Sequence, residues 1–536
     1  MWSRSPGTAA VRTSLTRMGC DIFAEAMTPY IIAEPPGACH TQTGRQIDCI
    51  VVGIYSVATM ARPKRGDTVS LSIDDLAFGG EGVGRADGYV VFVPGGVPGD
   101  RVRVRLGQAR SRFGRGVIES IEEPSPHRTV PPCPYFGRCG GCRLQHLAYP
   151  AQLAFKAKQV ADVLERLGGL TGVELRPIMG APETYGYRNK MEFTIAPRPL
   201  PPGGRASGAL VPEGAEGGVR GNPIVVGLHE ADRYDSVLDI ERCLLQSEGM
   251  NALLDEARHF FLERGLAAYE QDGGEGLLRF LVLREGRRTG EVMANVVTAG
   301  PAVSELAPLA ARLHARLPGT SSVVMNVNPK KASVAVGVEE HLLGGRDHIR
   351  ERIGGLTFQI SANSFFQTNT AQAERLFELV IASAALEGEE TVVDLYSGTG
   401  AISLLLARRC RWVYGVEVAQ AAVDDAGLNA AANGIANCTF LAGEVRFVLP
   451  SLIAKGVTAE VVVADPPRAG FHPKALHALA TLGPARIVYV SCNPSTLARD
   501  VGELVRRGYR LEWVRPVDMF PHTPHFEAVA RLVKGA

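Results

Sequence analysis

The sequence predicts a multi-domain protein with a parallel α/β sheet at its C-terminal end, an α+β region in the middle and a small β-barrel near its N-terminal end. Three observations support this prediction. From residue 385 onward, apolar strand-like runs alternate with helix-like stretches, which is typical of a parallel sheet. Between residues 66 and 121, short strand-like runs are separated by glycine turns, which favours a barrel. Strand and helix patterns are mixed between these two regions.

The composition narrows the class of protein. The chain has 536 residues, 46% of them hydrophobic, and a formal net charge of +1, so no global charge indicates a partner. No apolar run reaches the length of about 18 residues that a membrane span needs. The ten cysteines are unevenly spaced, which favours metal binding or catalysis in a reducing compartment, and we expect a cytoplasmic protein. No feature indicates an obligate protein partner.

Residues 1–60 differ from the remainder of the chain. They are rich in Ser, Thr, Pro and Gly and have no sustained period, and the first twenty are rich in arginine and poor in acids, as in a transit peptide. We expect an N-terminal extension that is disordered or results from an upstream start, and we assign it no function.

Residues 61–123 predict an OB-like barrel. The run "RVRVRL" alternates, so Arg101, Arg103 and Arg105 lie on one face of a strand while the intervening valines lie on the other. Further arginines follow in the next strand and turn. From the arginines alone, two interpretations are equally supported: a solvated charged strand, or a groove that binds a phosphate backbone.

Residues 124–355 predict the α+β region, with a Pro/Gly-rich insertion at 198–222. Cys133, Cys139 and Cys142 have the spacing C-x5-C-x2-C, and Cys243 follows about a hundred residues later. Zinc ribbons favour two C-x2-C pairs, which this is not. Three close thiolates and a remote one are compatible with a [4Fe–4S] cluster, and the spacing alone leaves zinc and iron–sulfur open.

Residues 356–536 predict the α/β sheet with a Rossmann-like order. "VVDLYSGTG" is a strand followed by a glycine turn and a helix, with Ser403 in place of a third fingerprint glycine. Seven strands are expected, the last two paired antiparallel. Because ligands bind beyond the carboxyl ends of parallel strands, the polar residues there form a candidate site. They are Tyr396, Glu417, Asp465 and Cys492.

Cys492 is the strongest candidate for catalysis. In "IVYVSCNPSTLARD" an apolar strand ends, and a thiol stands at its tip before Asn-Pro. The predicted strand order with its acidic strand ends resembles the Rossmann-like fold of S-adenosylmethionine-dependent methyltransferases. In such a fold, methylation of a pyrimidine at C5 would need a thiolate that adds to C6 beside the methyl donor, and a base that removes the C5 proton. A buried structural cysteine is the alternative. In "DPPRAG", Arg468 stands where amino-directed methyltransferases have an aromatic residue, which argues against amine methylation and leaves carbon.

The motifs "SCNPSTLARD", "DPPRAG", "FFQTN" (365–369), "DLYSGTG" and "FPHTPHFEAV" resemble those of the RNA uracil-5-methyltransferase family, from about residue 64 to the C-terminus. The resemblance implies a C-terminal S-adenosylmethionine (SAM) methyltransferase domain and a TRAM domain for the barrel. It implies that Cys492 is the nucleophile and Glu527 the base, for which His522 or His525 could compete. It further implies SAM contacts at Gln367, Tyr396, Glu417 and Asp465, and a [4Fe–4S] cluster on Cys133, Cys139, Cys142 and Cys243.

We therefore expect methyl transfer from SAM to C5 of a uridine in structured RNA. A barrel combined with a cluster is typical, in the family, of members that act on large-subunit ribosomal RNA, so 23S rRNA is favoured and tRNA is the alternative. A cytosine-5 RNA methyltransferase is disfavoured, because the Pro-Cys expected near the "DPP" loop is absent. A non-catalytic RNA-binding protein is disfavoured by the presence of both Cys492 and Glu527.

Overall fold

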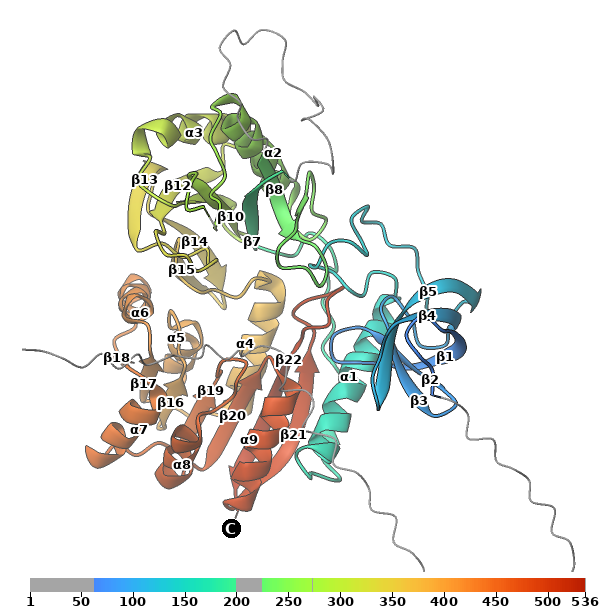
Figure 1. Cartoon of the computed structure of the whole chain (residues 1–536). Helices are drawn as coiled ribbons and strands as arrows, with labels where there is room; N and C mark the ends of the chain where they lie inside the picture. The colour runs from blue at the N-terminus through green and yellow to red at the C-terminus, as the bar shows by residue number, and fades with distance from the viewer. Residues whose placement is uncertain (1–61, 199–223, 272, 536) are drawn as a thin grey trace, which may run out of the picture. The chain divides into compact units, whose positions relative to one another are not determined.

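The structure, a computed structural model, describes residues 62–198, 224–271 and 273–535 (Figure 1). The predicted extension at 1–60 lies outside the described residues, as does all but the first residue of the predicted insertion at 198–222. None of the helices in the described part of the chain has the length and apolar character needed to cross a membrane.

The first five strands close into a barrel in the order β1-β2-β3-β5-β4. Its alternating pattern buries Val102 and Val104 completely and leaves Arg101, Arg103 and Arg105 exposed, which confirms the predicted faces. Strands β3 and β5 pair parallel, and β4 closes the barrel against β1. The strands are β1 (Thr68–Leu76), β2 (Gly82–Ala86), β3 (Tyr89–Val93), β4 (Arg101–Ala109) and β5 (Phe113–Glu123).

A seven-stranded sheet follows in the order β13-β12-β11-β10-β7-β8-β9. Only β11 and β12 pair parallel, because α3 crosses over between them. Helices α2 (Glu248–Glu263) and α3 (Val303–Arg316) bury their apolar faces against the sheet. The strands are β7 (Lys190–Pro197), β8 (Ile224–His229), β9 (Val237–Asp239), β10 (Leu278–Gly286), β11 (Glu291–Thr298), β12 (Thr320–Val327) and β13 (Glu339–Gly345). A separate hairpin consists of β14 (His348–Ile353) and β15 (Leu356–Ser361).

The C-terminal sheet has the order β18-β17-β16-β19-β20-β22-β21-β6. All seven predicted strands are present, and the last two pair antiparallel as expected. The strand order reverses between β16 and β19, which creates the crevice where ligands of such sheets bind. The strands are β16 (Thr391–Leu395), β17 (Trp412–Glu417), β18 (Cys438–Ala442), β19 (Val461–Ala464), β20 (Arg486–Ser491), β21 (Tyr509–Val517) and β22 (Glu527–Lys534).

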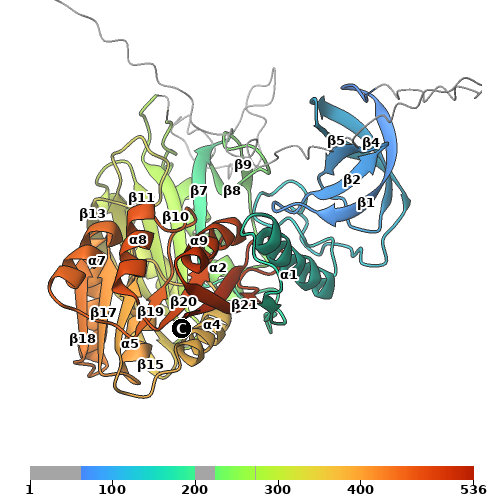
Figure 2. The ribbon, with the colours of Figure 1, turned by 90° about the horizontal axis from the view of Figure 1, so that it is seen from below.

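Helices cover both faces of this sheet, because consecutive residues of its buried strands point to opposite sides. Val392 packs in the core that contains α4 and α5, whereas Val393 packs in the core that contains α1 and α7–α9. Figure 2 shows α7, α8 and α9 on one side of the strands and α4 and α5 on the other. The helices are α4 (Thr370–Ala384), α5 (Ala401–Ala407), α6 (Gln420–Ala432), α7 (Val445–Ala454), α8 (Pro473–Leu482) and α9 (Pro494–Arg506).

Two elements from much earlier in the chain complete the C-terminal sheet. Helix α1 (Tyr149–Arg166) packs against α9 and β21, and the short strand β6 (Glu174–Leu175) adds an eighth strand beside β21. The sequence did not predict β6. The predicted domain boundaries 61–123, 124–355 and 356–536 remain predictions. Helix α1 and strand β6 belong to the range 124–355, but they pack with elements of the range 356–536.

Candidate active site and cysteine pocket

The loop after β16 lies at the point where the sheet order reverses. Tyr396 has a φ of 66°, and Gly398 and Gly400 have φ values of 54° and 82°, so three residues of this turn are left-handed. A Cβ atom on Gly400 would lie 3.1 Å from Ala426 and from the Phe440 ring, so this glycine is required by both φ and space. The turn leads directly into α5.

Asp394, which sequence reasoning missed, lies beneath this loop and is 1% exposed. Ser403, the residue in place of the third fingerprint glycine, donates a 2.5 Å hydrogen bond from Oγ to Asp394 Oδ2. Burial, to which the charges of Asp465 and Glu417 add, raises the pKa of Asp394 to about 7. The only signal in the sequence was the position of an acid inside an apolar strand, one residue before its end.

A pocket opens beside this loop and is lined by acids and aromatic rings. Three of the four predicted cofactor residues line it: Gln367, Tyr396 and Asp465, together with Asp394. The fourth, Glu417, accepts hydrogen bonds from the backbone N–H groups of Gly398 at 3.1 Å and Ala419 at 2.9 Å. Buried carboxylates favour a cationic ligand, so the pocket fits a sulfonium compound such as SAM.

Cys492 directly follows β20, as the sequence predicted. Asn493 explains the residues after it: its side chain accepts a hydrogen bond from Ser495 N at 3.0 Å and caps α9, and Pro494 occupies the first turn. The Asn493 amide also donates to Arg468 O at 3.0 Å, which ties the thiol-bearing turn to the "DPPRAG" loop. The thiol is therefore held on a rigid strand-to-helix turn.

Cys492 and Glu527 lie close enough to influence each other electrostatically. Burial, followed by the carboxyls of Glu527 and Asp465, raises the pKa of the Cys492 thiol to about 11, and the Arg468 guanidinium opposes this rise. Glu527, the first residue of β22, is 6% exposed, and burial followed by the nearby Asp465 raises its pKa well above the usual range. Its Oε2 atom has no hydrogen-bond partner among the described residues. The structure thus brings a thiol, a free carboxyl oxygen and a pocket-lining acid together.

The two competing histidines differ in their surroundings. His525 Nδ1 lies 3.0 Å from Arg468 Nη2, and burial together with nearby cations lowers its pKa to about 4. His522 stacks on the Tyr185 ring with centroids 4.3 Å apart and contacts Gln152 through Nδ1. Arg468 lowers the pKa of both Cys492 and Glu527, against the effect of burial. Arg468 is therefore a site residue whose role the sequence did not indicate.

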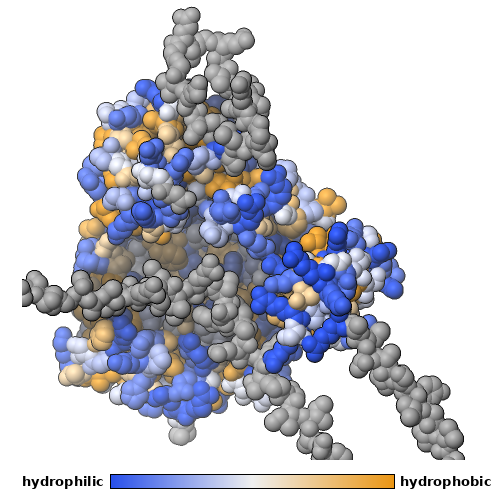
Figure 3. Space-filling model, in the orientation of Figure 1, coloured by the Kyte–Doolittle hydropathy of each residue, from blue (hydrophilic) through white to orange (hydrophobic). Residues whose placement is uncertain are grey.

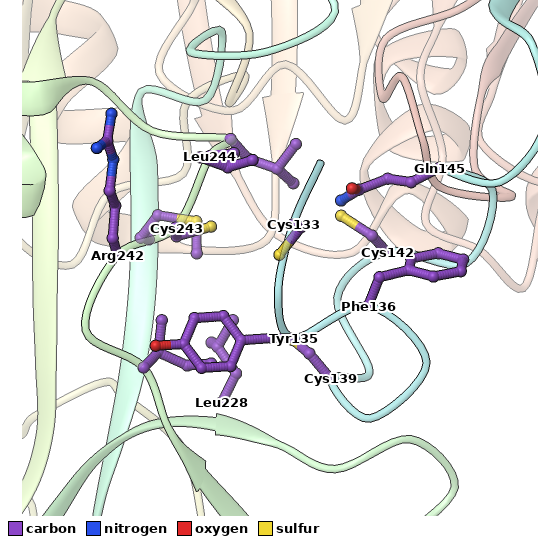
Figure 4. A pocket seen from close by; sticks show the side chains of 13 residues that line it. Cys133, Tyr135, Phe136, Cys139, Cys142, Gln145, Leu228, Arg242, Cys243 and Leu244 are labelled. Atoms are coloured by element: carbon purple, nitrogen blue, oxygen red, sulfur yellow. The ribbon is translucent and has the colours of Figure 1, made fainter. Parts of the chain in front are cut away.

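The four predicted cluster cysteines line one pocket. Cys133, Cys139 and Cys142 come from the loop before α1, and Cys243 comes from the loop before α2. Figure 4 shows the sulfur atoms of Cys142 and Cys243 on opposite sides of Cys133, among apolar side chains such as Leu244. Burial and the neighbouring cysteines raise the pKa of Cys142 to about 12.

The residue types around this pocket suit a metal, since four cysteines are ligands that both iron–sulfur clusters and structural zinc ions use. The N–H of Gly141 donates to Cys139 Sγ at 3.4 Å. The side chain of Asn251 in α2 accepts a hydrogen bond from Cys243 N and donates one to Cys243 O. However, in residues 62–198, 224–271 and 273–535 no three His, Cys, Asp or Glu side chains stand in a metal-binding arrangement. The four cysteines line one pocket, but their side chains are not arranged as they would be around a bound metal ion.

The arginine face of the barrel is partly neutralised. Arg101 forms ion pairs with Glu122 at 3.3 Å and Glu123 at 3.8 Å, whereas Arg103 and Arg105 form none with any described residue. Figure 3 shows hydrophilic side chains gathered over the barrel. An exposed strand with two unpaired guanidinium groups can bind a polyanion.

The sheet order and the acid-lined pocket define a SAM-dependent methyltransferase. The family model described as "tRNA (Uracil-5-)-methyltransferase" matches residues 337–534, and the model of the TRAM domain matches residues 62–118.

Similar proteins match this chain over most of its length. An uncharacterised RNA methyltransferase of Halalkalibacterium halodurans is 40% identical over 468 residues, which cover 87% of this chain and 97% of that protein. One of Chlorobaculum tepidum is 41% identical over 476 residues, with 88% and 97% covered. The crystal structure of Pyrococcus abyssi tRNA (uracil-54, C5)-methyltransferase with S-adenosyl-L-homocysteine matches with a TM-score of 0.64 at 30% identity, covering 86% of this chain and 99% of that one. The chain belongs to the SAM-dependent RNA uracil-5-methyltransferase family.

Proposed function

We propose that the protein methylates C5 of a specific uridine in structured RNA through a covalent bond between Cys492 and C6 of the base. The observation that carries this proposal is the proximity of Cys492 and Glu527 beside Asp465, which lines the pocket for the methyl donor. Bound SAM supplies the methyl group that C5 receives. A chain that only bound RNA would have no need of a buried carboxyl close to a thiol.

The Cys492 thiolate adds to C6, and the electrons of the C5–C6 double bond move to C5, where the new carbon–carbon bond forms. In the free protein the thiol is protonated at neutral pH, because its pKa is about 11, and it releases this proton to solvent water before it attacks C6. Arg468 is the cation that lowers this pKa, so it favours the thiolate. The uridine must leave its stack to reach the thiol, so the target is flipped out or lies in a loop.

Glu527 acts at the second stage. After methylation, C5 carries both a proton and the methyl group, and the proton must be removed before the C6–sulfur bond can break. Glu527 Oε2 is the base that takes this proton, after which the C5–C6 double bond reforms and Cys492 leaves as a thiolate. A carboxyl with a raised pKa is a stronger base than an ordinary glutamate, which suits removal of a carbon-bound proton.

Four residues would hold SAM. Gln367, Tyr396 and Asp465 would contact it from the pocket wall. Glu417 would act through the loop that it holds by a hydrogen bond from the N–H of Gly398. Cys133, Cys139, Cys142 and Cys243 would hold a [4Fe–4S] cluster. Burial and the neighbouring cysteines disfavour the thiolate form of Cys142, so a cationic cluster between the four sulfur atoms would supply the missing positive charge. No redox step is needed for methyl transfer, and we assign the cluster a structural role near the RNA-binding surface.

The favoured substrate is 23S rRNA, because the barrel and the four-cysteine loop add a large surface outside the catalytic domain that can recognise one site in a large RNA. The second candidate is tRNA, and the match to the Pyrococcus abyssi tRNA enzyme favours it. The cytoplasmic location remains a prediction from the reduced cysteines.

Two experiments test the proposal. Wild-type protein and Cys492→Ala are incubated with SAM and 5-fluorouridine transcripts of 23S rRNA and of tRNA. Only the wild type should form a complex that survives denaturing electrophoresis, because fluorine cannot leave C5 as a proton does. Comparable methylation by Cys492→Ala would rule out the covalent route. Nucleoside mass spectrometry of RNA from a deletion strain decides the substrate: loss of 5-methyluridine only from tRNA would reject 23S rRNA and leave the chemistry intact.

A further inference from the structure

Residues 518–526, here called the base loop, connect β21 to β22 and lead directly into Glu527. The loop has no regular secondary structure, so its position depends on contacts with other parts of the chain. It is nevertheless largely enclosed, and Asp518 at its start is fully buried. The placement of the proposed base is therefore determined by whatever holds this loop.

Lys156 of α1 makes three hydrogen bonds to the base loop and is itself only 2% exposed. Its Nζ donates to Asp518 Oδ1 at 2.7 Å, to the carbonyl of Phe520 at 3.3 Å and to the carbonyl of His525 at 3.1 Å. All three ammonium protons are therefore used within the loop. The contacts span it from its first residue to the residue two before Glu527.

Other side chains fasten the same loop at intermediate points. Gln152, one helical turn before Lys156, accepts a hydrogen bond from His522 N at 3.0 Å. Tyr187 donates to the carbonyl of Pro521 at 3.0 Å, and Asn369 donates to the carbonyl of Met519 at 3.0 Å. These groups each hold one residue, whereas Lys156 joins both ends of the loop.

A buried lysine–aspartate pair is a costly way to gain stability, because two charges must lose their water. A hydrophobic pair of the same volume is often as stable. What such a pair does provide is a fixed direction, since the ammonium must face Asp518 and the two carbonyls at once. The three hydrogen bonds of Lys156 therefore fix the position of the base loop.

We propose that Lys156 is a positioning residue for the methylation reaction: by joining Asp518, Phe520 and His525 it holds Glu527 where it can remove the C5 proton. This inference rests on the proposed function and assigns Lys156 to one step of it. Lys156 does not line the SAM pocket, so we expect its replacement to leave SAM binding unchanged. Displacing a base by about 1 Å slows its step about 100-fold.

The test compares four variants in their accumulation of the methylated covalent intermediate. Glu527→Gln is the reference, Lys156→Met removes the anchor, and Lys156→Met/Asp518→Leu removes both charges so that no unpaired carboxylate remains buried. Lys158→Met is the matched control, because it lies on the same helix and forms exposed ion pairs with Asp75 and Asp162 instead. Each variant is incubated with tritiated SAM and with rRNA and tRNA from the deletion strain. The tritium label that stays on the protein in a denaturing gel reports the covalent intermediate. The KM for SAM and the melting temperature of each variant are also measured.

We expect Lys156→Met/Asp518→Leu to accumulate labelled adduct as Glu527→Gln does, with an unchanged KM for SAM and turnover about 100-fold lower. Lys158→Met should resemble the wild type. If the double variant melts near the wild-type temperature and turns over normally without adduct, the inference is wrong and the proposed function stands. If it loses adduct formation and turnover together, Lys156 is only structural. If Glu527→Gln forms no adduct, the role of Glu527 fails and the positioning role fails with it.

Discussion

Ser403 Oγ donates a 2.5 Å hydrogen bond to Asp394 Oδ2 at the floor of the cofactor pocket. The bond holds a buried carboxyl toward the pocket that we propose for the positively charged methyl donor. Burial raises the pKa of Asp394 to about 7 and that of Asp465 to about 6, so both carboxyls change charge between about pH 5 and pH 8. The pocket's charge, and with it the affinity for a sulfonium, depends on pH.

We predict that SAM binding weakens as the pH falls from 8 to 5, because protonation of Asp394 and Asp465 removes the negative charge that attracts the sulfonium. Asp394→Asn should weaken SAM binding at pH 8 and flatten its pH dependence, as measured by isothermal titration calorimetry. S-adenosylhomocysteine, which lacks the sulfonium charge, should respond less. Asp424→Asn, on the outer part of α6, is the control. Equal pH profiles for Asp394→Asn and the wild type would contradict this prediction.

Glu527→Gln should raise the melting temperature while it blocks turnover. The folded-state pKa of Glu527 lies above its unfolded value of about 4.5, so the folded protein binds the proton more tightly. The penalty for burying the carboxylate is therefore absent below about pH 4.5 and grows as the pH rises toward the folded pKa. The gain in melting temperature over the wild type should be larger at pH 8 than at pH 5. Scanning calorimetry at both pH values checks it, and a gain that shrinks with rising pH would count against a raised pKa.

Replacement of Arg103 or Arg105 by Gln should weaken RNA binding and reduce the slope of log K against log salt by about 0.7 to 0.9 for each phosphate that the variant no longer neutralises. Arg101→Gln should have a smaller effect, since Arg101 already pairs with Glu122 and Glu123. Filter binding at several salt concentrations measures the slopes. The modified uridine should be the same in all three variants, and a change of target would show that the barrel reads sequence.

Protein purified without oxygen should be brown and contain about four irons per chain, as one [4Fe–4S] centre requires. Cys243→Ser should lower the iron content, whereas Cys438→Ser, in β18, should not. Iron and zinc analysis with absorption spectroscopy distinguishes the metals. Colourless protein with one zinc per chain would reject the cluster and leave a zinc site on the same cysteines.

The sequence predicted elements whose signal is local. The alternation around Arg103 identified one barrel face, and the seven strand-like runs predicted after residue 385 are all strands. Strand β6 was not predictable, because two residues carry no period. Lys156 resembled an ordinary exposed lysine on an amphipathic helix, since its partner Asp518 lies 362 residues away.

The pairing of Lys156 with Asp518 also sets the timing of assembly on the ribosome. At about 5 to 20 residues per second, helix α1 is complete about 20 to 70 seconds before Asp518 is synthesised. During that interval its lysine has no carboxylate to meet, and one edge of β20 has no neighbour, because β22 is inserted between β20 and β21 only at the end. Translation must therefore be almost finished before the C-terminal sheet can close, and until then the edge of β20 that β22 will pair with stays unpaired.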